Sequence, residues 1–563
     1  MEQMRLLLAI VLSFLVFVVW QWLVVEPEVA KNAQDQQMVS ESTVHQEDAS
    51  APSESSREES PQPTAEKAPA PATPSEPTRD DREARTIRVE TPLYTVTLTE
   101  RGASIDDLTL KNYRESAEED SPQKEMIQAE ARQIPLQTGW EGKQQQLAGW
   151  EDALYALDAT RDVISVEDKE QSLEFHFTNT DGVTIKKQFV FYPDSYLIDM
   201  NVSFVNQSSG AIDGKPTIKI ANVVGDPNSR ISFEGPMALI DGKLEETKIK
   251  EIEKKPQMEG TFRWIGITDR YFMSVLIPEE PVTGSMKMEK AGEAMVIAEL
   301  VLPEATIPQN TEKVYKYKVF IGPKDTELLA KVNYDLGKAV NFGMFDFLAK
   351  PFLWIMNQIY KVIPNYGIAI IILTLLTKII LWPLGNKSYK SMNDMKRMQP
   401  LMAEIREKYK DDKKKINEET MALYRTYKIN PMGGCLPMIV QLPVFLALYR
   451  MLYQAIELRH APFFSWINDL SAPDRLFHFG FSIPFMQPPY GIPVLTVVMG
   501  ATMFLQQKMS PPPGDPTQAK MMMFMPLIFT VIFINFPAGL VLYWLTNNIF
   551  SIAQQYYIQK KFA

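Results

Sequence analysis

One charged residue, Lys378, lies inside a long apolar run in the C-terminal third of the chain. The run covers residues 366–384, and about 20 apolar residues in a helix span the roughly 30 Å hydrocarbon core of a bilayer. A lysine at the centre of such a helix costs at least ~2.5 kcal/mol on insertion scales. We therefore expect the Lys378 ammonium to face a hydrated cavity or a partner, because lipid would leave the charge uncompensated.

Polar residues accompany Lys378 in this and other apolar stretches. Those expected near the lysine are Thr374, Gln441, Tyr543, Trp544, Asn547 and Asn548. Together they indicate one shared hydrophilic interior. Thr, Asn and Gln also commonly hydrogen-bond between membrane helices, and this is the favoured interpretation of Thr374 alone, which lies one helical turn before the lysine. Lys378 differs, because the other apolar stretches contain no carboxylate to pair with it. Its ammonium needs water or an incoming anion.

Six apolar stretches set the expected membrane topology. They cover residues 6–25, 366–384, 436–456, 493–508, 521–535 and 540–557. The segment 386–430 between them is rich in Lys and Arg, and its apolar residues follow helical spacing, which indicates a cytoplasmic helical hairpin. A solvated charged loop is the alternative. Six spans place both termini on one side of the membrane, and the basic segment makes that side the cytoplasm.

The N-terminal region contains an expected anchor and a linker. Residues 1–25 are interpreted as an uncleaved transmembrane anchor. A cleaved signal peptide is the alternative, but the apolar run is longer than the usual core of about 7–15 residues and no A-x-A-like site follows it. Residues 26–85 are rich in Pro, Ser, Glu and Ala. Such a composition buries too little apolar surface to fold, so we expect a disordered periplasmic linker.

Residues 86–335 alternate between apolar and polar residues, as half-buried strands do. Leu173, Phe175 and Phe177 show this period, and a Thr-Asp-Gly turn signal follows at 180–182. The region predicts one large antiparallel β domain on the periplasmic side. Residues 342–363 have apolar residues at three- and four-residue steps, which predicts an amphipathic helix in the membrane interface. A helix packed on the β domain is the alternative.

Composition restricts the chemistry of the chain. Its 563 residues exceed one ordinary domain, and the formal net charge is −11. The single Cys435 excludes an internal disulfide, and four widely spaced histidines argue against a His-based metal site. The sequence contains no phosphate-binding loop, no H-E-x-x-H and no G-x-S-x-G. We therefore expect no metal, no cofactor and no enzymatic activity.

Short motifs of the C-terminal third resemble the YidC/Oxa/Alb family of membrane insertases. They are the segment 430–449, which begins Asn-Pro-Met-Gly-Gly-Cys-Leu-Pro, then Gln-Gln-Lys-Met-Ser-Pro at 506–511, Phe-Met-Pro at 524–526, and Phe-Pro-Ala-Gly at 536–539 followed by Tyr543 and Trp544. The resemblance covers about 342–560. The anchor and the β domain resemble Gram-negative members of the family. The implied fold is an α-helical membrane core of five transmembrane helices within 364–563, an N-terminal anchor helix, and a large all-β, supersandwich-like periplasmic domain.

The resemblance also implies a substrate groove. The family's intramembrane positive charge corresponds to Lys378, and its groove-lining positions correspond to Thr374, Gln441, Tyr543, Trp544 and Asn547. Bacterial relatives usually carry arginine where this chain has Lys378. Lysine keeps a charge but lacks the rigid, permanently protonated guanidinium. The hairpin 386–430 resembles a family element needed for insertion.

The implied function is that of an insertase and chaperone for nascent membrane proteins in the bacterial inner membrane. The resemblance implies action alone or beside the Sec translocon, with the ribosome and the signal recognition particle or its receptor at the cytoplasmic face. We expect no nucleic acid binding by the chain itself. One alternative is a transporter of small solutes or ions that uses Lys378. Another is a carbohydrate enzyme in the β domain, which no cluster of carboxylates or histidines favours.

Overall fold

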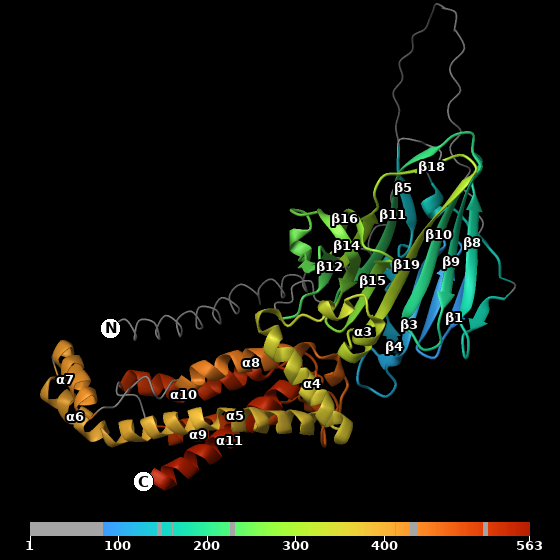
Figure 1. Ribbon diagram of the computed structural model, residues 1–563. Helices are drawn as coiled ribbons and strands as arrows, with labels where there is room; N and C mark the ends of the chain where they lie inside the picture. The colour runs from blue at the N-terminus through green and yellow to red at the C-terminus, as the bar shows by residue number, and fades with distance from the viewer. Residues whose placement is uncertain are drawn as a thin grey trace, which may run out of the picture. The chain divides into compact units, whose positions relative to one another are not determined.

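The computed structural model describes residues 83–142, 149–159, 161–225, 231–410, 412–427, 436–510 and 516–562 (Figure 1). All of them belong to one compact unit, Glu76–Ala563. The expected anchor at 1–25 and the linker up to residue 82 lie outside the described residues. The described part contains an all-β region followed by a helical region.

The all-β region consists of two sheets. Its strands are β1 (Thr86–Glu90), β2 (Tyr94–Thr99), β3 (Ser104–Arg114), β4 (Gln123–Glu125), β5 (Thr138–Glu141), β6 (Ala156–Leu157), β7 (Val163–Ser165), β8 (Gln171–Thr178), β9 (Val183–Phe191), β10 (Leu197–Asn206), β11 (Ile212–Val223), β12 (Gly235–Ile240), β13 (Lys243–Glu246), β14 (Gln257–Thr268), β15 (Phe272–Pro278), β16 (Val282–Ala291), β17 (Met295–Val301), β18 (Ala305–Ile307) and β19 (Thr311–Pro323). The smaller sheet has the order β4-β3-β2-β1-β7. The main path of the larger sheet is β18-β11-β17-β16-β14-β15-β19-β10-β9-β8-β6. Pairing is antiparallel along both paths, except that β1 and β7 are parallel.

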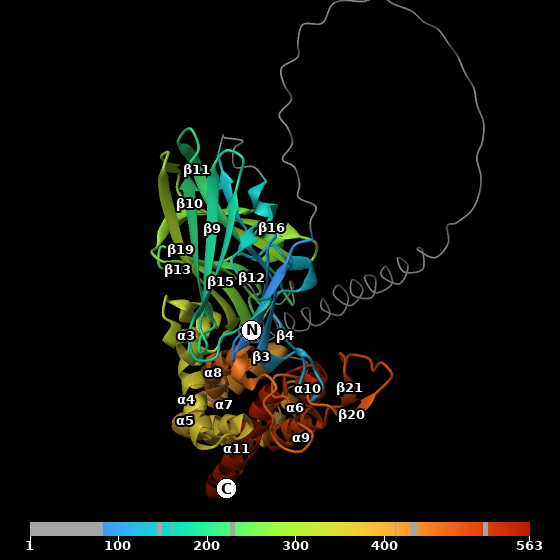
Figure 2. The same ribbon diagram turned by 90° about the vertical axis from the view of Figure 1, so that its right-hand side faces the viewer.

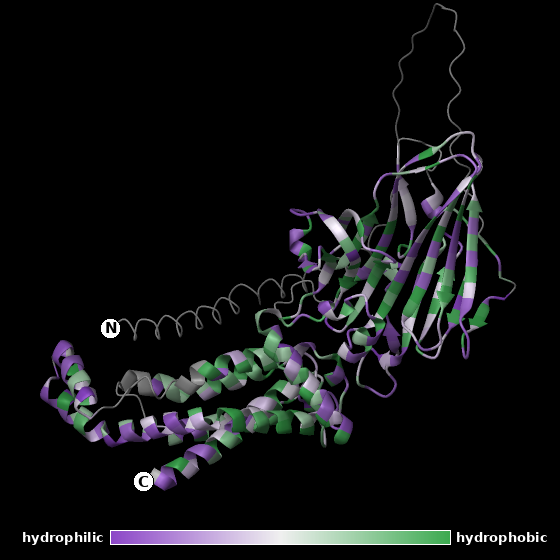
Figure 3. Cartoon of the chain, viewed as in Figure 1, coloured by the Kyte–Doolittle hydropathy of each residue, from purple (hydrophilic) through white to green (hydrophobic). Residues whose placement is uncertain are grey.

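Period-two alternation explains the burial of these strands. In β9, Val183, Ile185, Phe189 and Phe191 are buried, and the residues at the alternate positions 184, 186, 188 and 190 are more exposed. Figure 3 shows the same alternation as stripes along the strands. The turn before β9 needs Gly182, whose φ of 86° favours glycine. The prediction of a large all-β domain is confirmed.

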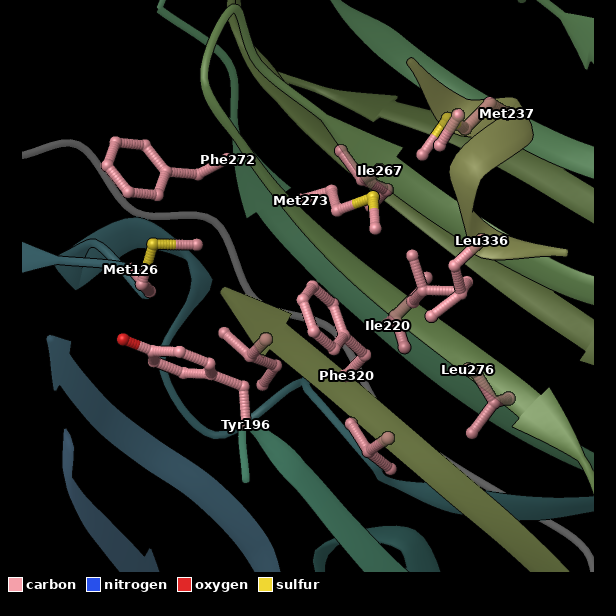
Figure 4. Packing of buried hydrophobic residues seen from close by; sticks show 14 of the residues in the cluster. Met126, Tyr196, Ile220, Met237, Ile267, Phe272, Met273, Leu276, Phe320 and Leu336 are labelled. Atoms are coloured by element: carbon pink, nitrogen blue, oxygen red, sulfur yellow. The ribbon is translucent and has the colours of Figure 1, made fainter. Parts of the chain in front are cut away.

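The core of the β region is made of aromatic and aliphatic side chains. Figure 4 shows Phe320 of β19 among side chains that include Tyr196 and Ile220. The ring centroids of Tyr196 and Phe320 lie 6.4 Å apart at 64°, within the range of edge-to-face pairs. A charged residue shares this interior, because the Lys187 side chain of β9 is fully buried.

Two helices link the β region to the apolar helices. Helix α3 (Thr326–Val332) begins at Asp325, whose carboxylate accepts a hydrogen bond from the Leu328 amide at 2.8 Å. Helix α4 (Asp346–Val362) lies within the expected amphipathic segment. It buries Leu353 and Met356 on one side.

The helical region contains a helix at each of the five apolar stretches of the C-terminal third. Its elements are α5 (Tyr366–Arg397), α6 (Gln399–Lys408), α7 (Lys413–Thr426), α8 (Leu436–Gln454), α9 (Val494–Met509), α10 (Pro516–Phe533) and α11 (Ala538–Phe562), with the short strands β20 (Leu476–Phe479) and β21 (Tyr490–Ile492) between α8 and α9. Helix α11 packs against α5 and α9, and α9 packs against α10 (Figures 1 and 2).

Helix α5 is longer than its apolar run. It continues past Pro383 to Arg397, so the first part of the basic segment belongs to the same helix. Helices α6 and α7 pack together, and the Tyr424 hydroxyl lies 3.5 Å from the Met402 sulfur. Figure 3 shows these two helices as largely hydrophilic. Among the described residues, α5 alone is long and apolar enough to cross a membrane by length and composition, and Lys520–Phe533 forms a shorter apolar stretch.

Candidate functional site

The structure places Lys378 on the face of α5 that contacts α11. Asn365 begins α5 by accepting a hydrogen bond from the Ile368 amide at 3.0 Å. The Lys378 Nζ donates to the Ser551 Oγ of α11 at 2.7 Å. Ser551 is 3% exposed, so the amine points into the helix assembly rather than outward.

No carboxylate neutralises this ammonium in the part of the chain that the structure describes. None of the ion pairs found there, all within 4.0 Å, includes Lys378. A serine hydroxyl satisfies one of the three amine hydrogens and carries no countercharge. The arrangement therefore suits an anion that enters from elsewhere.

Gln441 and Asn547 form a hydrogen bond close to Ser551, the partner of Lys378. The Gln441 Nε2 of α8 donates to the Asn547 Oδ1 of α11 at 2.8 Å. The Tyr543 side chain, one turn earlier on α11, is 3% exposed. Two of the expected groove residues are thus joined by a polar contact between α8 and α11, and a third lies buried one turn away on α11.

Trp544 lies in an aromatic cluster. Its ring packs edge-on against Phe445 of α8, with centroids 4.6 Å apart at 85°. It also contacts Phe533 of α10, with centroids 4.9 Å apart at 67°. Such contacts pack the apolar rings of an indole, while its N–H can still donate a hydrogen bond to a polar partner. Trp544 therefore connects α8, α10 and α11.

The Thr374 hydroxyl is turned toward its own helix. It is 1% exposed, and its Oγ1 donates to the Ile370 carbonyl at 2.7 Å. This i−4 bond is a common way for a threonine to satisfy its hydroxyl inside an apolar helix. The structure thus places Thr374 on the inner side of α5 without a hydrogen bond to Lys378.

Sequence patterns singled out Asn547 and Asn548 of α11 but not Ser551 and Gln554, which extend the polar stripe of this helix. The Asn548 Nδ2 donates to the Thr502 Oγ1 of α9 at 3.2 Å. The Gln554 Nε2 donates to the Asn386 Oδ1 of α5 at 3.0 Å. Asn548, Ser551 and Gln554 follow three-residue steps along α11, so helical periodicity applied to the last apolar stretch would have found Ser551 and Gln554.

The outer faces of the same helices are apolar. On α5, Ile379 and Ile380 are 58% and 75% exposed, and on α10 Leu527 is 62% exposed. Large exposed apolar surfaces mark contact with a membrane or a partner. The helical region thus buries several polar side chains among apolar ones and exposes many apolar side chains, unlike a water-soluble bundle. Among the described residues, no group of three or more His, Cys, Asp or Glu could hold a metal ion.

Two family models match the chain. Residues 86–355 match the YidC periplasmic domain, and residues 358–563 match the family described as 60Kd inner membrane protein. The membrane protein insertase YidC of Syntrophus aciditrophicus is 42% identical over 480 residues, which cover 84% of this chain and 85% of that protein. The chain belongs to the YidC family of membrane protein insertases. The YidC of Nitratidesulfovibrio vulgaris strain DP4 is 36% identical over 576 residues and covers 100% of both chains.

The solved structures include one titled as an active YidC insertase with the first transmembrane domain resolved. It is 20% identical and covers 84% of this chain and 93% of its own, with a TM-score of 0.37. A TM-score this low adds no weight to the family assignment, which stands on the sequence relatives. The YidC periplasmic model covers β1 to β19, and the other model covers α5 to α11.

Proposed function

We propose that this chain inserts proteins into the membrane through a hydrophilic groove whose charge is Lys378. As a member of the YidC family, the chain is a membrane protein insertase of the inner membrane with a periplasmic β domain, and its substrates are nascent membrane proteins. The family assignment favours this function over a small-solute or ion transporter. The proposal concerns how insertion takes place, and the residues that perform it are Lys378, Gln441, Tyr543, Trp544 and Asn547.

One observation carries the groove proposal. The Lys378 ammonium is directed into the helix assembly, onto Ser551, with no carboxylate beside it in the described part of the chain. A buried charge without a fixed partner is costly, and residues of this kind inside membrane segments typically serve substrates or ions. An acidic client tail would supply the missing negative charge.

In the proposed mechanism the groove opens toward the cytoplasm and the lipid. The short acidic N-terminal tail of a client enters it and is attracted to Lys378, so the tail avoids bare hydrocarbon. The apolar client helix then moves past Tyr543 and Trp544 into lipid, and transfer of its apolar surface drives this step. The membrane potential contributes about 2.3 kcal/mol per charge per 100 mV for an acidic tail that moves outward.

The topology of the proposal follows from charge and apolar surface. Five helices, α5 and α8 to α11, form the membrane core, and the anchor at 1–25 makes six spans with both termini in the cytoplasm. The basic hairpin α6–α7 then lies in the cytoplasm, in accord with the positive-inside rule. This hairpin is the surface that we assign to the ribosome and to the signal recognition particle or its receptor. Action beside the Sec translocon belongs to the same proposal.

Helix α4 is proposed to lie in the periplasmic membrane interface. Its buried side faces the protein, while Phe347, Trp354 and Val362 are exposed at 70%, 63% and 81%. An amphipathic helix with exposed aromatic and aliphatic residues buries that face at the boundary between headgroups and acyl chains. The helix would thus hold the periplasmic end of α5 at a fixed depth.

The test replaces Lys378 in the full-length protein and measures insertion of a single-span client with an acidic tail into proteoliposomes. We expect Lys378→Ala to reduce insertion strongly and Lys378→Glu to abolish it, because the second change repels the tail. Lys520 lies on α10, outside the segment 386–430, and is exposed, so Lys520→Ala and Lys520→Glu are matched controls that should retain insertion. Normal insertion by both Lys378 variants would refute the charge mechanism.

A further inference from the structure

Ser551 is the group that fixes where the Lys378 ammonium points. Among the described residues, its Oγ is the amine's one hydrogen-bond acceptor, at 2.7 Å. The Ser551 hydroxyl itself donates to the Asn547 carbonyl at 2.7 Å. Because its hydrogen is used within α11, the oxygen presents lone pairs to the amine. The hydroxyl is thus held as an acceptor for a cation.

The remaining hydroxyls near the lysine on α5 do not take this role. The Thr374 hydroxyl donates to the Ile370 carbonyl, and the Thr377 hydroxyl donates to the Thr374 carbonyl at 2.8 Å. A lysine stem is flexible, and its ammonium tends to extend toward the nearest aqueous face when nothing holds it. Without Ser551, we therefore expect the Lys378 charge to move away from the contact between Gln441 and Asn547.

We propose that Ser551 is a positioning residue that sets the preference of this insertase for clients with acidic tails. By holding the ammonium beside Asn547, it places the positive charge at one depth between α5 and α11. A tail carboxylate that reaches this depth meets the two amine hydrogens that Ser551 leaves free. This inference rests on the proposed groove function and assigns its selectivity to a residue outside the expected groove set.

The experiment compares two clients on the full-length protein in proteoliposomes. They are identical single-span proteins, except that the acidic residues of one N-terminal tail are replaced by their amides in the other. The readout is the ratio of acidic-tail to amide-tail insertion. A ratio does not depend on how much of a variant is folded, so partial misfolding leaves it unchanged.

Ser551→Ala should lower this ratio by about fivefold, the factor that corresponds to ~1 kcal/mol at 1.4 kcal/mol per tenfold change. Ser551→Thr keeps the hydroxyl and should restore the ratio. Gln559→Ala is the matched control, because the Gln559 Nε2 bonds α11 to the Met509 carbonyl of α9 at 3.0 Å and does not contact Lys378. It should leave the ratio at its wild-type value.

The outcomes separate this inference from the groove proposal. If Lys378→Ala removes the preference and Ser551→Ala leaves it unchanged, the inference is wrong and the groove proposal stands. A Ser551→Ala variant that loses both clients equally would also overturn the inference, since a structural role alone gives that result. If Lys378→Ala leaves the preference intact, the groove proposal itself fails.

Discussion

The buried Lys187 makes the stability of the β region depend on pH. Its Nζ donates to the Gly102 carbonyl at 2.5 Å, the Leu136 carbonyl at 3.0 Å and the Ala103 carbonyl at 3.4 Å. Loss of solvation lowers the pKa of Lys187 to about 7, and the nearby Glu151 carboxylate opposes this shift without cancelling it. The lysine therefore joins two loops to β9 and titrates near neutral pH.

The sign of the effect follows from proton linkage. The folded pKa is about 7, and the ordinary lysine value is 10.5. Between these values the unfolded chain binds the proton that the folded chain has lost, so the free energy of unfolding rises with pH. From pH 6 to pH 9 the gain is about 3 kcal/mol for this single group, since each pKa unit is worth a little over ~1 kcal/mol.

The assay is urea unfolding of the purified full-length protein, followed by pulse proteolysis of the β region across this pH range. Lys187→Met removes the titrating group at similar size, so the difference in free energy of unfolding between wild type and variant should grow by about 3 kcal/mol from pH 6 to pH 9. The methionine side chain would also leave the Gly102 and Leu136 carbonyls without a donor, which costs ~1–3 kcal/mol for each buried group. Lys186→Met, at the exposed neighbouring position of β9, is the control and should parallel the wild type. Parallel curves for Lys187→Met and the wild type would refute this reasoning.

Two further predictions concern contacts between the apolar helices. A double-mutant cycle with Gln441→Ala and Asn547→Ala, measured by unfolding in mixed micelles, should give a coupling of ~0.6 kcal/mol and no more than ~1.7 kcal/mol; zero coupling would mean that their hydrogen bond adds nothing. Gly500→Val on α9 should destabilise the helical region by ~1–3 kcal/mol, because a side chain there collides with Thr530 of α10. Gly480→Val is the control, since a Cβ at Gly480 meets no atom within 4 Å, and equal losses in both variants would contradict the role of this close approach.

Lys187 also shows how far periodicity can be taken. The alternation in β9 that places Val183, Ile185, Phe189 and Phe191 inside places residue 187 on the same face, since successive side chains of a strand point to opposite sides. The alternation therefore predicts that the side chain at position 187 is buried, although lysine as a residue type is usually found at the surface. The three carbonyls that receive its hydrogens come from distant loops, which no local pattern identifies.

The sequence by itself determined the β region, the apolar helices and the isolation of Lys378 among apolar residues. These properties depend on residue type and on the fixed periods of strand and helix, so they can be read from neighbouring positions. Only the tertiary structure decided that Ser551 receives the ammonium, that Gln441 meets Asn547, and that Thr374 bonds its own helix. The first two contacts join residues more than a hundred positions apart, and the choice of partner in all three depends on how the helices pack and rotate against one another.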